Sequence, residues 1–151
     1  MSPKTISGGL LFEVPVLSAD ETLAGAVPKV VEANVPALPV TGANGRLAGI
    51  FGERELITAI FPGYLGELHY AAFVTGVAQA HLELRECGSE PVSQHMNTDH
   101  IDVGPDYSDA QIAEIFLHHR VLIVPVVDGD RVTGIVTRSD FFRALAARVG
   151  S

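Results

Sequence analysis

The chain repeats itself once, and this internal repeat restricts the possible folds more than any other feature of the sequence. A shift of 86 positions superimposes six pairs of identical residues: Ser7 and Ser93, Asp20 and Asp106, Ala24 and Ala110, Val35 and Val121, Pro39 and Pro125, Val40 and Val126. A shift of 85 then pairs Arg46 with Arg131, Gly49 with Gly134 and Ile50 with Ile135. The lost residue falls in a turn, where changes in length are tolerated. The sequence therefore predicts two copies of one folding unit.

The second half of the chain carries start and stop signals for a helix. Ser108 followed by Gln111 is a capping-box pattern. Side chains then recur at helical spacing, at Ile112, Ile115, Phe116 and His119. We expect an amphipathic helix that ends at Arg120.

A hairpin and a closing helix are predicted next. Val121 to Val127 is an apolar run of strand length, which we expect to be buried on both faces. Asp128-Gly129-Asp130 makes the turn, and Val132 to Val136 returns. The closing helix begins at Ser139 or Asp140 and carries Phe141, Phe142, Leu145 and Arg148. The unit is therefore a strand, a helix, two strands and a helix.

The first half follows the same course with a poorer fit. Leu23, Val27, Val30 and Val31 mark its helix, Ala37 to Val40 and Leu47 to Phe51 its two strands, and Asn44-Gly45 its turn. Pro28 lies inside the helix, where its missing N–H should cause a bend or a late helix start.

Pro and Gly residues divide the middle of the chain. A helix from Glu55 to Phe61 is stopped by Pro62-Gly63, the segment Leu65 to Glu86 reads mostly as helix, and Gly88 to Pro91 breaks the chain again. We expect repeat 1 over residues 6–61, a helical linker over 62–90 and repeat 2 over 91–148.

Composition restricts the partners and the setting. The net charge of -8 opposes binding to DNA or RNA, and no segment approaches the roughly 20 apolar residues of a membrane span. The single cysteine, Cys87, cannot form a disulfide within the chain, which favours a reducing cytoplasm. A soluble cytoplasmic protein that binds neither nucleic acid nor membrane is expected.

The stretch Gly134-Ile135-Val136-Thr137-Arg138-Ser139-Asp140 resembles the signature of the CBS domain family. It lies at a predicted strand-to-helix junction and has a weaker copy one repeat earlier. The resemblance implies an α+β fold of two βαββα repeats, packed about a pseudo-twofold axis. It also implies clefts that bind AMP, ADP, ATP or S-adenosylmethionine as a regulatory ligand, with no required cofactor.

The resemblance implies particular roles for the residues of this stretch. Asp140 offers two acceptor oxygens for ribose hydroxyls and Thr137 a hydroxyl, while Ser139 and Arg138 flank a seat for phosphate. Gly134 allows close backbone approach. The residues expected around the adenine are apolar: Ile101, Val124, Pro125 and Ile135.

The copy in the first repeat departs from the signature. Gly49 to Glu55 has Gly52 in place of the threonine and Glu55 in place of the aspartate. We expect Glu53 and Glu55 to repel a phosphate there. This cleft is either empty or used differently.

Other interpretations of the same residues remain open. Asp140 could cap a helix without binding a ligand. The apolar strand residues could form the core without contacting adenine. A metal site at His95, Asp99, His100 and Asp102 is not expected, because these residues lack helical spacing. Neither they nor Cys87 suggest catalysis, so we expect a regulatory module and not an enzyme. The alternative is a structural interaction module whose clefts have decayed.

The expected partners are a separate regulated protein and a second copy of the chain. Surplus apolar residues on two helices predict a homodimer: Leu56, Ile57 and Ile60 in one repeat, Phe141, Phe142 and Leu145 in the other. The linker could instead cover them.

Overall fold

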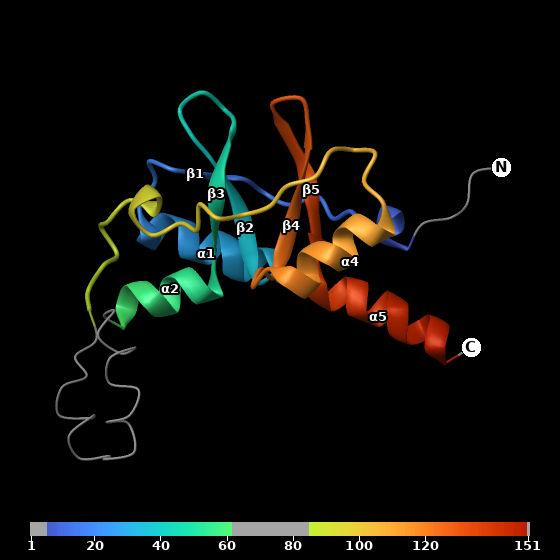
Figure 1. The fold of residues 1–151 in the computed structure, drawn as a ribbon. Coiled ribbons are helices and arrows are strands. Elements are labelled where there is room, and N and C mark those ends of the chain that lie inside the picture. Colours follow the sequence, from blue (N-terminus) through green and yellow to red (C-terminus); the bar gives the residue numbers. More distant parts are fainter. Residues whose placement is uncertain (1–5, 62–84, 151) are drawn as a thin grey trace, which may run out of the picture.

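The computed structural model describes residues 6–61 and 85–150, which form two similar halves side by side (Figure 1). The first half contains η1 (Ser7–Leu10), β1 (Leu17–Ser18), α1 (Leu23–Ala33), β2 (Ala37–Thr41), β3 (Leu47–Gly52) and α2 (Glu53–Ile60). The second contains η4 (Val92–Gln94), α4 (Asp109–His118), β4 (Ile123–Asp128), β5 (Arg131–Thr137) and α5 (Arg138–Val149). The predicted α+β fold with two repeats is confirmed.

Each half is built on an antiparallel hairpin. In the first, β2 pairs with β3 and a short parallel β1 joins β2 at the edge. In the second, β4 pairs with β5, and the first strand of the repeat is reduced to one parallel bridge between Val103 and Val126. The Val103 N–H donates to Pro125 at 3.0 Å, so β4 is covered along both edges. This agrees with its burial from Ile123 to Val126.

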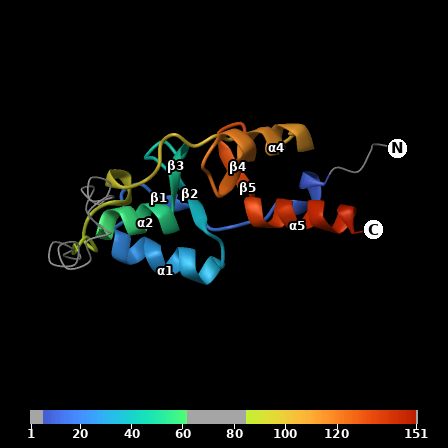
Figure 2. The same cartoon turned by 60° about the horizontal axis from the view of Figure 1, so that its bottom comes forward.

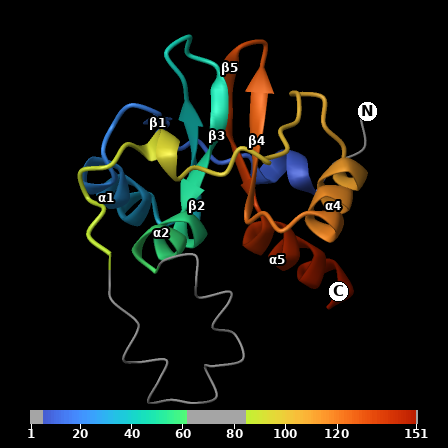
Figure 3. The same ribbon diagram turned by 60° about the vertical axis from the view of Figure 1, so that its left-hand side comes forward.

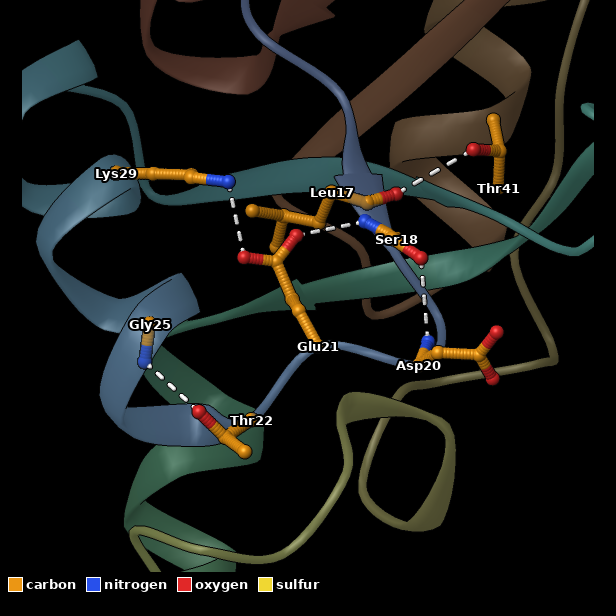
Figure 4. Close-up of polar contacts among 8 residues, drawn as sticks. All are labelled: Leu17, Ser18, Asp20, Glu21, Thr22, Gly25, Lys29 and Thr41. Carbon is orange, nitrogen blue, oxygen red and sulfur yellow. Dashed lines mark hydrogen bonds and ion pairs between the residues drawn. The ribbon is translucent and has the colours of Figure 1, made fainter.

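A network of side chains holds the start of α1 (Figure 4). The Thr22 hydroxyl accepts the Gly25 N–H at 3.2 Å and caps the helix. Glu21 accepts from the Ser18 N–H at 2.7 Å and from Lys29 at 2.9 Å. The helix therefore starts at Leu23, well before Pro28, so of the two expected outcomes the late start is wrong, because the Thr22 cap fixes the first turn. The bend at Pro28 stays a prediction.

The predicted capping box of α4 is confirmed, but α5 begins earlier than expected. In α4 the Ser108 hydroxyl accepts the Gln111 N–H at 3.1 Å. In α5 the cap is Thr137, whose extended backbone ends β5 and whose hydroxyl accepts the Asp140 N–H at 3.1 Å. The helix starts at Arg138, so neither Ser139 nor Asp140 is its first residue.

The two halves exchange the segments that lead into them. Phe12 forms an antiparallel bridge with Ile135 of the second half, and Asn97 forms the same bridge with Ile50 of the first. A shift of 85 relates the two bridges, so the exchange is reciprocal. Figures 2 and 3 show the result for the N-terminal segment, whose blue η1 lies beside α4 and α5.

The N-terminal segment is anchored on α4 by one carboxylate. Asp109 accepts from the N–H of Ile6 at 2.9 Å, the N–H of Ser7 at 2.7 Å and the hydroxyl of Ser7 at 2.5 Å. The Tyr107 hydroxyl donates to the Ser7 carbonyl at 2.7 Å. Ser7 is fully buried, so the first residues of the first half pack on the second half.

Most of the predicted linker helix lies outside the described residues. Its last two residues, Arg85 and Glu86, are described and are not helical. The chain beyond them packs on the start of α1, where the Ala24 N–H donates to Gly88 at 2.9 Å and the Leu23 N–H to Glu90 at 3.0 Å. The end of the linker thus satisfies N–H groups that the first turn of α1 leaves free.

Two apolar clusters form the core. One gathers mainly residues of the first half, together with Cys87 and Val92. The other gathers mainly residues of the second half, together with Ala37 and Ile50 of the first. The repeats are therefore joined by a shared core. No helix in residues 6–61 and 85–150 is both long and apolar enough to cross a membrane.

Candidate functional site

A cleft lies where the end of α1 faces the start of α5, and we call it the α1–α5 cleft. Its volume is about 1020 Å³. The two repeats both contribute to its walls, and the polar or exposed lining residues are Phe12, Val31, Asn34, Glu53, Thr137, Arg138, Ser139, Asp140, Phe142 and Arg143. The cleft is therefore a feature of the pair and not of a single repeat.

Four of the nine predicted site residues meet in this cleft: Thr137, Arg138, Ser139 and Asp140. Asp140 lies in the first turn of α5, and its side chain is 39% exposed with the Arg143 guanidinium 3.6 Å away. The cap of α5 is Thr137, so capping alone does not explain Asp140. The Thr137 hydroxyl accepts one hydrogen bond from the helix. It donates to no other group within residues 6–61 and 85–150, so its proton can be donated to a ligand.

The other five predicted residues do not line the cleft. Val124 and Ile135 are fully buried in the core, Pro125 and Gly134 are buried in their strands, and Ile101 packs half-buried against the same core. A Cβ on Gly134 would come within 2.7 Å of the Phe12 carbonyl. In this structure the close approach at Gly134 is made by the chain's own leading segment.

Two aromatic residues of the cleft, Phe12 and Phe142, were not predicted from the sequence as site residues. Phe12 is 46% exposed and Phe142 is 68% exposed, and both are lining residues. Phe12 arrives through its backbone bridge to Ile135, across more than a hundred residues of chain. No local pattern indicates such a contact. Phe142 could have been identified, because it follows Asp140 by only two positions.

Glu53 lies in a different cleft from the one we expected. It lines the α1–α5 cleft, together with Asp140, and is not among the residues that line the cleft of the first-repeat signature. The reason is that the α2 N-terminus lies at the seam, where its first residue faces the partner repeat. The carboxylates of this cleft are balanced by Arg138 and Arg143.

Glu55 folds back onto its own helix. Its Oε1 accepts the Gly52 N–H at 2.9 Å, and burial raises the pKa of this carboxyl above its usual 4.5. A Cβ on Gly52 would come within 2.1 Å of the Pro36 carbonyl, so a threonine does not fit there in this structure. The loss of the hydroxyl is therefore a packing requirement.

A second, smaller cleft corresponds to the first-repeat signature, and we call it the α2–α4 cleft. Its volume is about 510 Å³. It lies between the start of α2, the end of α4 and the start of α5, and its lining is Arg54, Phe116, Leu117, His118, His119, Arg120, Leu122 and Arg138. Arg138 and Leu122 line both clefts.

His95, one of the residues considered as metal ligands, has a carboxylate partner. His95 Nε2 lies 2.6 Å from Glu90, which also pairs with Arg85, and the hydrogen bond from His95 lowers the pKa of Glu90. Within the part of the chain that the structure describes, no group of three His, Cys, Asp or Glu residues could hold a metal ion. Cys87 is buried.

The fold, with clefts between its two repeats, defines a tandem α+β repeat module. The chain belongs to the CBS domain family, whose model matches residues 12–62 and 92–147. Both repeats are therefore CBS domains, as the resemblance of the Gly134 to Asp140 stretch indicated.

Known proteins with similar sequences or folds are diverse. The A-adding tRNA nucleotidyltransferase of Geobacter sulfurreducens is 29% identical over 110 residues, or 73% of this chain. The matched part is 10% of the length of that enzyme. The CBS domain of a membrane protein from Sphaerobacter thermophilus has a TM-score of 0.67 at 26% identity, covering 93% of this chain and 86% of that one. CBSX2, solved in complex with AMP, has a TM-score of 0.67 at 20% identity over 99% of this chain and 100% of its own.

Proposed function

We propose that the chain is a regulatory module that binds one adenosine-containing ligand in the α1–α5 cleft. The ligand class is AMP, ADP, ATP or S-adenosylmethionine. The observation that carries the proposal is the placement of the Thr137 hydroxyl at the N-cap of α5 and of the Asp140 carboxylate in its first turn, in a cleft of about 1020 Å³. The AMP complex of CBSX2 supports a nucleotide as the ligand of such a fold.

Each part of a nucleotide has a matching group in this cleft. The carboxylate of Asp140 accepts hydrogen bonds from ribose hydroxyls, and Arg138 and Arg143 attract phosphate. The exposed ring of Phe12 offers a surface for the base. Glu53 adds negative charge, which disfavours a long phosphate chain on its side of the cleft.

The signal is read by a separate protein, and the chain acts without catalysis in the cytoplasm. We propose a homodimer as the acting form. Of the six apolar residues predicted at the interface, Ile57, Phe142 and Leu145 are 57%, 68% and 40% exposed, whereas Phe141 is buried. Because Phe142 also lines the α1–α5 cleft, a ligand there would contact a residue of the proposed interface.

A thermal-shift series tests the binding proposal. The purified chain is melted with AMP, ADP, ATP, S-adenosylmethionine and NAD in turn. A ligand at 100 times its dissociation constant stabilises the folded state by about 2.7 kcal/mol, which is several degrees for a domain of this size. A shift with at least one adenosyl ligand is expected. No shift with any of them supports the alternative, a structural interaction module with decayed clefts.

A further inference from the structure

Positive charge gathers in the α2–α4 cleft of an acidic protein. Arg54, Arg120 and Arg138 line it, and they are three of the eight arginines in a chain of net charge -8. No carboxylate is among the lining residues. The α1–α5 cleft differs, because Glu53 and Asp140 stand there beside two arginines.

These guanidinium groups form no close ion pair within the described part of the protein, although the charge of Arg54 acts against the burial that raises the pKa of Glu55. None of the three forms a salt bridge with another residue in 6–61 or 85–150. Arg54 donates from Nη1 to the Arg120 carbonyl at 2.5 Å, which joins the start of α2 to the chain just after α4. Positive charges that line one cleft favour an anion among them.

The hydroxyl and the carboxylate that would bind the ribose of a nucleoside do not line this cleft. Gly52 provides no hydroxyl, and Glu55 is engaged with the Gly52 N–H and does not line the cleft. A ligand in this cleft would be bound by positive charge and by N–H donors. The guanidinium group of arginine has paired N–H donors whose geometry matches phosphate oxygens. His118 and His119 line the same cleft and add ring nitrogens.

We propose that the α2–α4 cleft binds an oligophosphate. The volume of about 510 Å³ is ample for a few linked phosphate groups. The oligophosphate is either a free inorganic chain or the phosphate tail of a nucleotide whose nucleoside lies in the α1–α5 cleft, since Arg138 lines both clefts. The free form does not depend on the proposed nucleotide function.

Calorimetric titration with sodium tripolyphosphate tests this site. At fixed ionic strength the full chain should bind one tripolyphosphate saturably, and sodium sulfate at the same ionic strength should not compete. Arg54→Gln and Arg120→Gln should each weaken binding about tenfold, which is the usual effect of one charged hydrogen bond. Arg131→Gln is the matched control, because Arg131 is exposed and lines neither cleft. Melting curves without ligand verify that all variants fold.

Further titrations distinguish a free oligophosphate chain from the phosphate tail of a nucleotide. For a free chain, Asp140→Ala leaves tripolyphosphate binding unchanged. For a nucleotide tail, tripolyphosphate alone does not bind, ATP binds about tenfold or more tightly than AMP, and Arg120→Gln removes that difference. The proposal is overturned when tripolyphosphate does not bind and ATP shows no advantage over AMP, or when Arg54→Gln and Arg120→Gln behave as Arg131→Gln does. Binding of AMP alone reports on the α1–α5 cleft separately.

Discussion

Asp140 is the residue whose removal best separates ligand binding from folding. Its carboxylate is 39% exposed, does not cap α5, and has Arg143 as its ion-pair partner among the described residues, at 3.6 Å. A pair this exposed contributes little to stability. The side chain is therefore available to a ligand.

Asp140→Ala should weaken nucleotide binding at least tenfold. The change removes acceptors for two ribose hydroxyls, and hydrogen bonds to charged groups contribute about 1.5–3 kcal/mol each. Calorimetry measures the affinity. Glu55→Ala is the comparison, because Glu55 lies outside the α1–α5 cleft and should change nucleotide affinity far less. Unchanged affinity in Asp140→Ala contradicts the role assigned to this carboxylate.

A second residue, Asp109, should control stability and its response to acid. Asp109→Ala leaves the N–H and hydroxyl of the buried Ser7 without their acceptor, at a cost of about 1–3 kcal/mol. The melting temperature should fall by about 2–4 °C per kcal/mol. The exposed Asp106→Ala, which lies outside this network, is the control and should melt like the wild type.

The effect of Asp109→Ala should depend on pH. Burial alone would raise the pKa of Asp109, but the hydrogen bonds from Ser7 and Ile6 outweigh it and hold the pKa below its usual 3.8. The stabilisation is therefore present above pH 3.8 and is lost as the pH falls through the lowered pKa. The difference in melting temperature should shrink over that range. A difference that grows as the pH falls contradicts the anchor.

Among the elements, β5 depends on close contact with the leading segment. Gly134→Ala would place a Cβ 2.7 Å from the Phe12 carbonyl and 2.9 Å from Leu11 Cδ1. Overpacking of this kind costs about 1–3 kcal/mol, so melting should occur several degrees lower. The control is Gly104→Ala, whose Cβ meets nothing within 4 Å.

The same substitution should also affect the site. Phe12 is held by its bridge to Ile135, so a displaced bridge moves its ring from the α1–α5 cleft. Nucleotide affinity should fall in Gly134→Ala and not in Gly104→Ala. An unchanged melting temperature and affinity in Gly134→Ala would show that the exchanged segment is not held in this way.

Local signals predicted most elements, and long-range contacts account for what was missed. The Ser108 and Gln111 pattern gave the start of α4, because a capping box involves only neighbouring residues. The start of α5 was misplaced by one or two residues because Thr137 serves both β5 and the helix. The bridges of Phe12 and Asn97 could not be predicted, since they depend on how the two repeats pack. The residues on the α5 side of the cleft were predicted from a local motif. Those at the end of α1 were not, because their position also depends on how the repeats pack.

The whole molecule exposes apolar side chains on both closing helices. Gel filtration with light scattering at micromolar concentration should give a mass of about twice 16.0 kDa, from an isologous interface of more than about 1,000 Å². Ile57→Glu should shift the mass toward that of one chain, since Ile57 is 57% exposed on α2 and lines neither cleft. Glu32→Gln, at an exposed position of α1, is the control. A wild-type mass near 16.0 kDa contradicts the dimer.

The stoichiometry of nucleotide binding tests the central claim most directly. Titration calorimetry of the full chain with AMP, ADP, ATP and S-adenosylmethionine should show, for at least one of them, a single nucleoside site per chain that depends on Asp140. One site is expected because Thr137 and Asp140 line the α1–α5 cleft. The equivalent residues of the first repeat provide no such groups, since Gly52 has no hydroxyl and Glu55 does not line the α2–α4 cleft. Two sites of similar affinity per chain, or no binding of any of the four, would contradict the account.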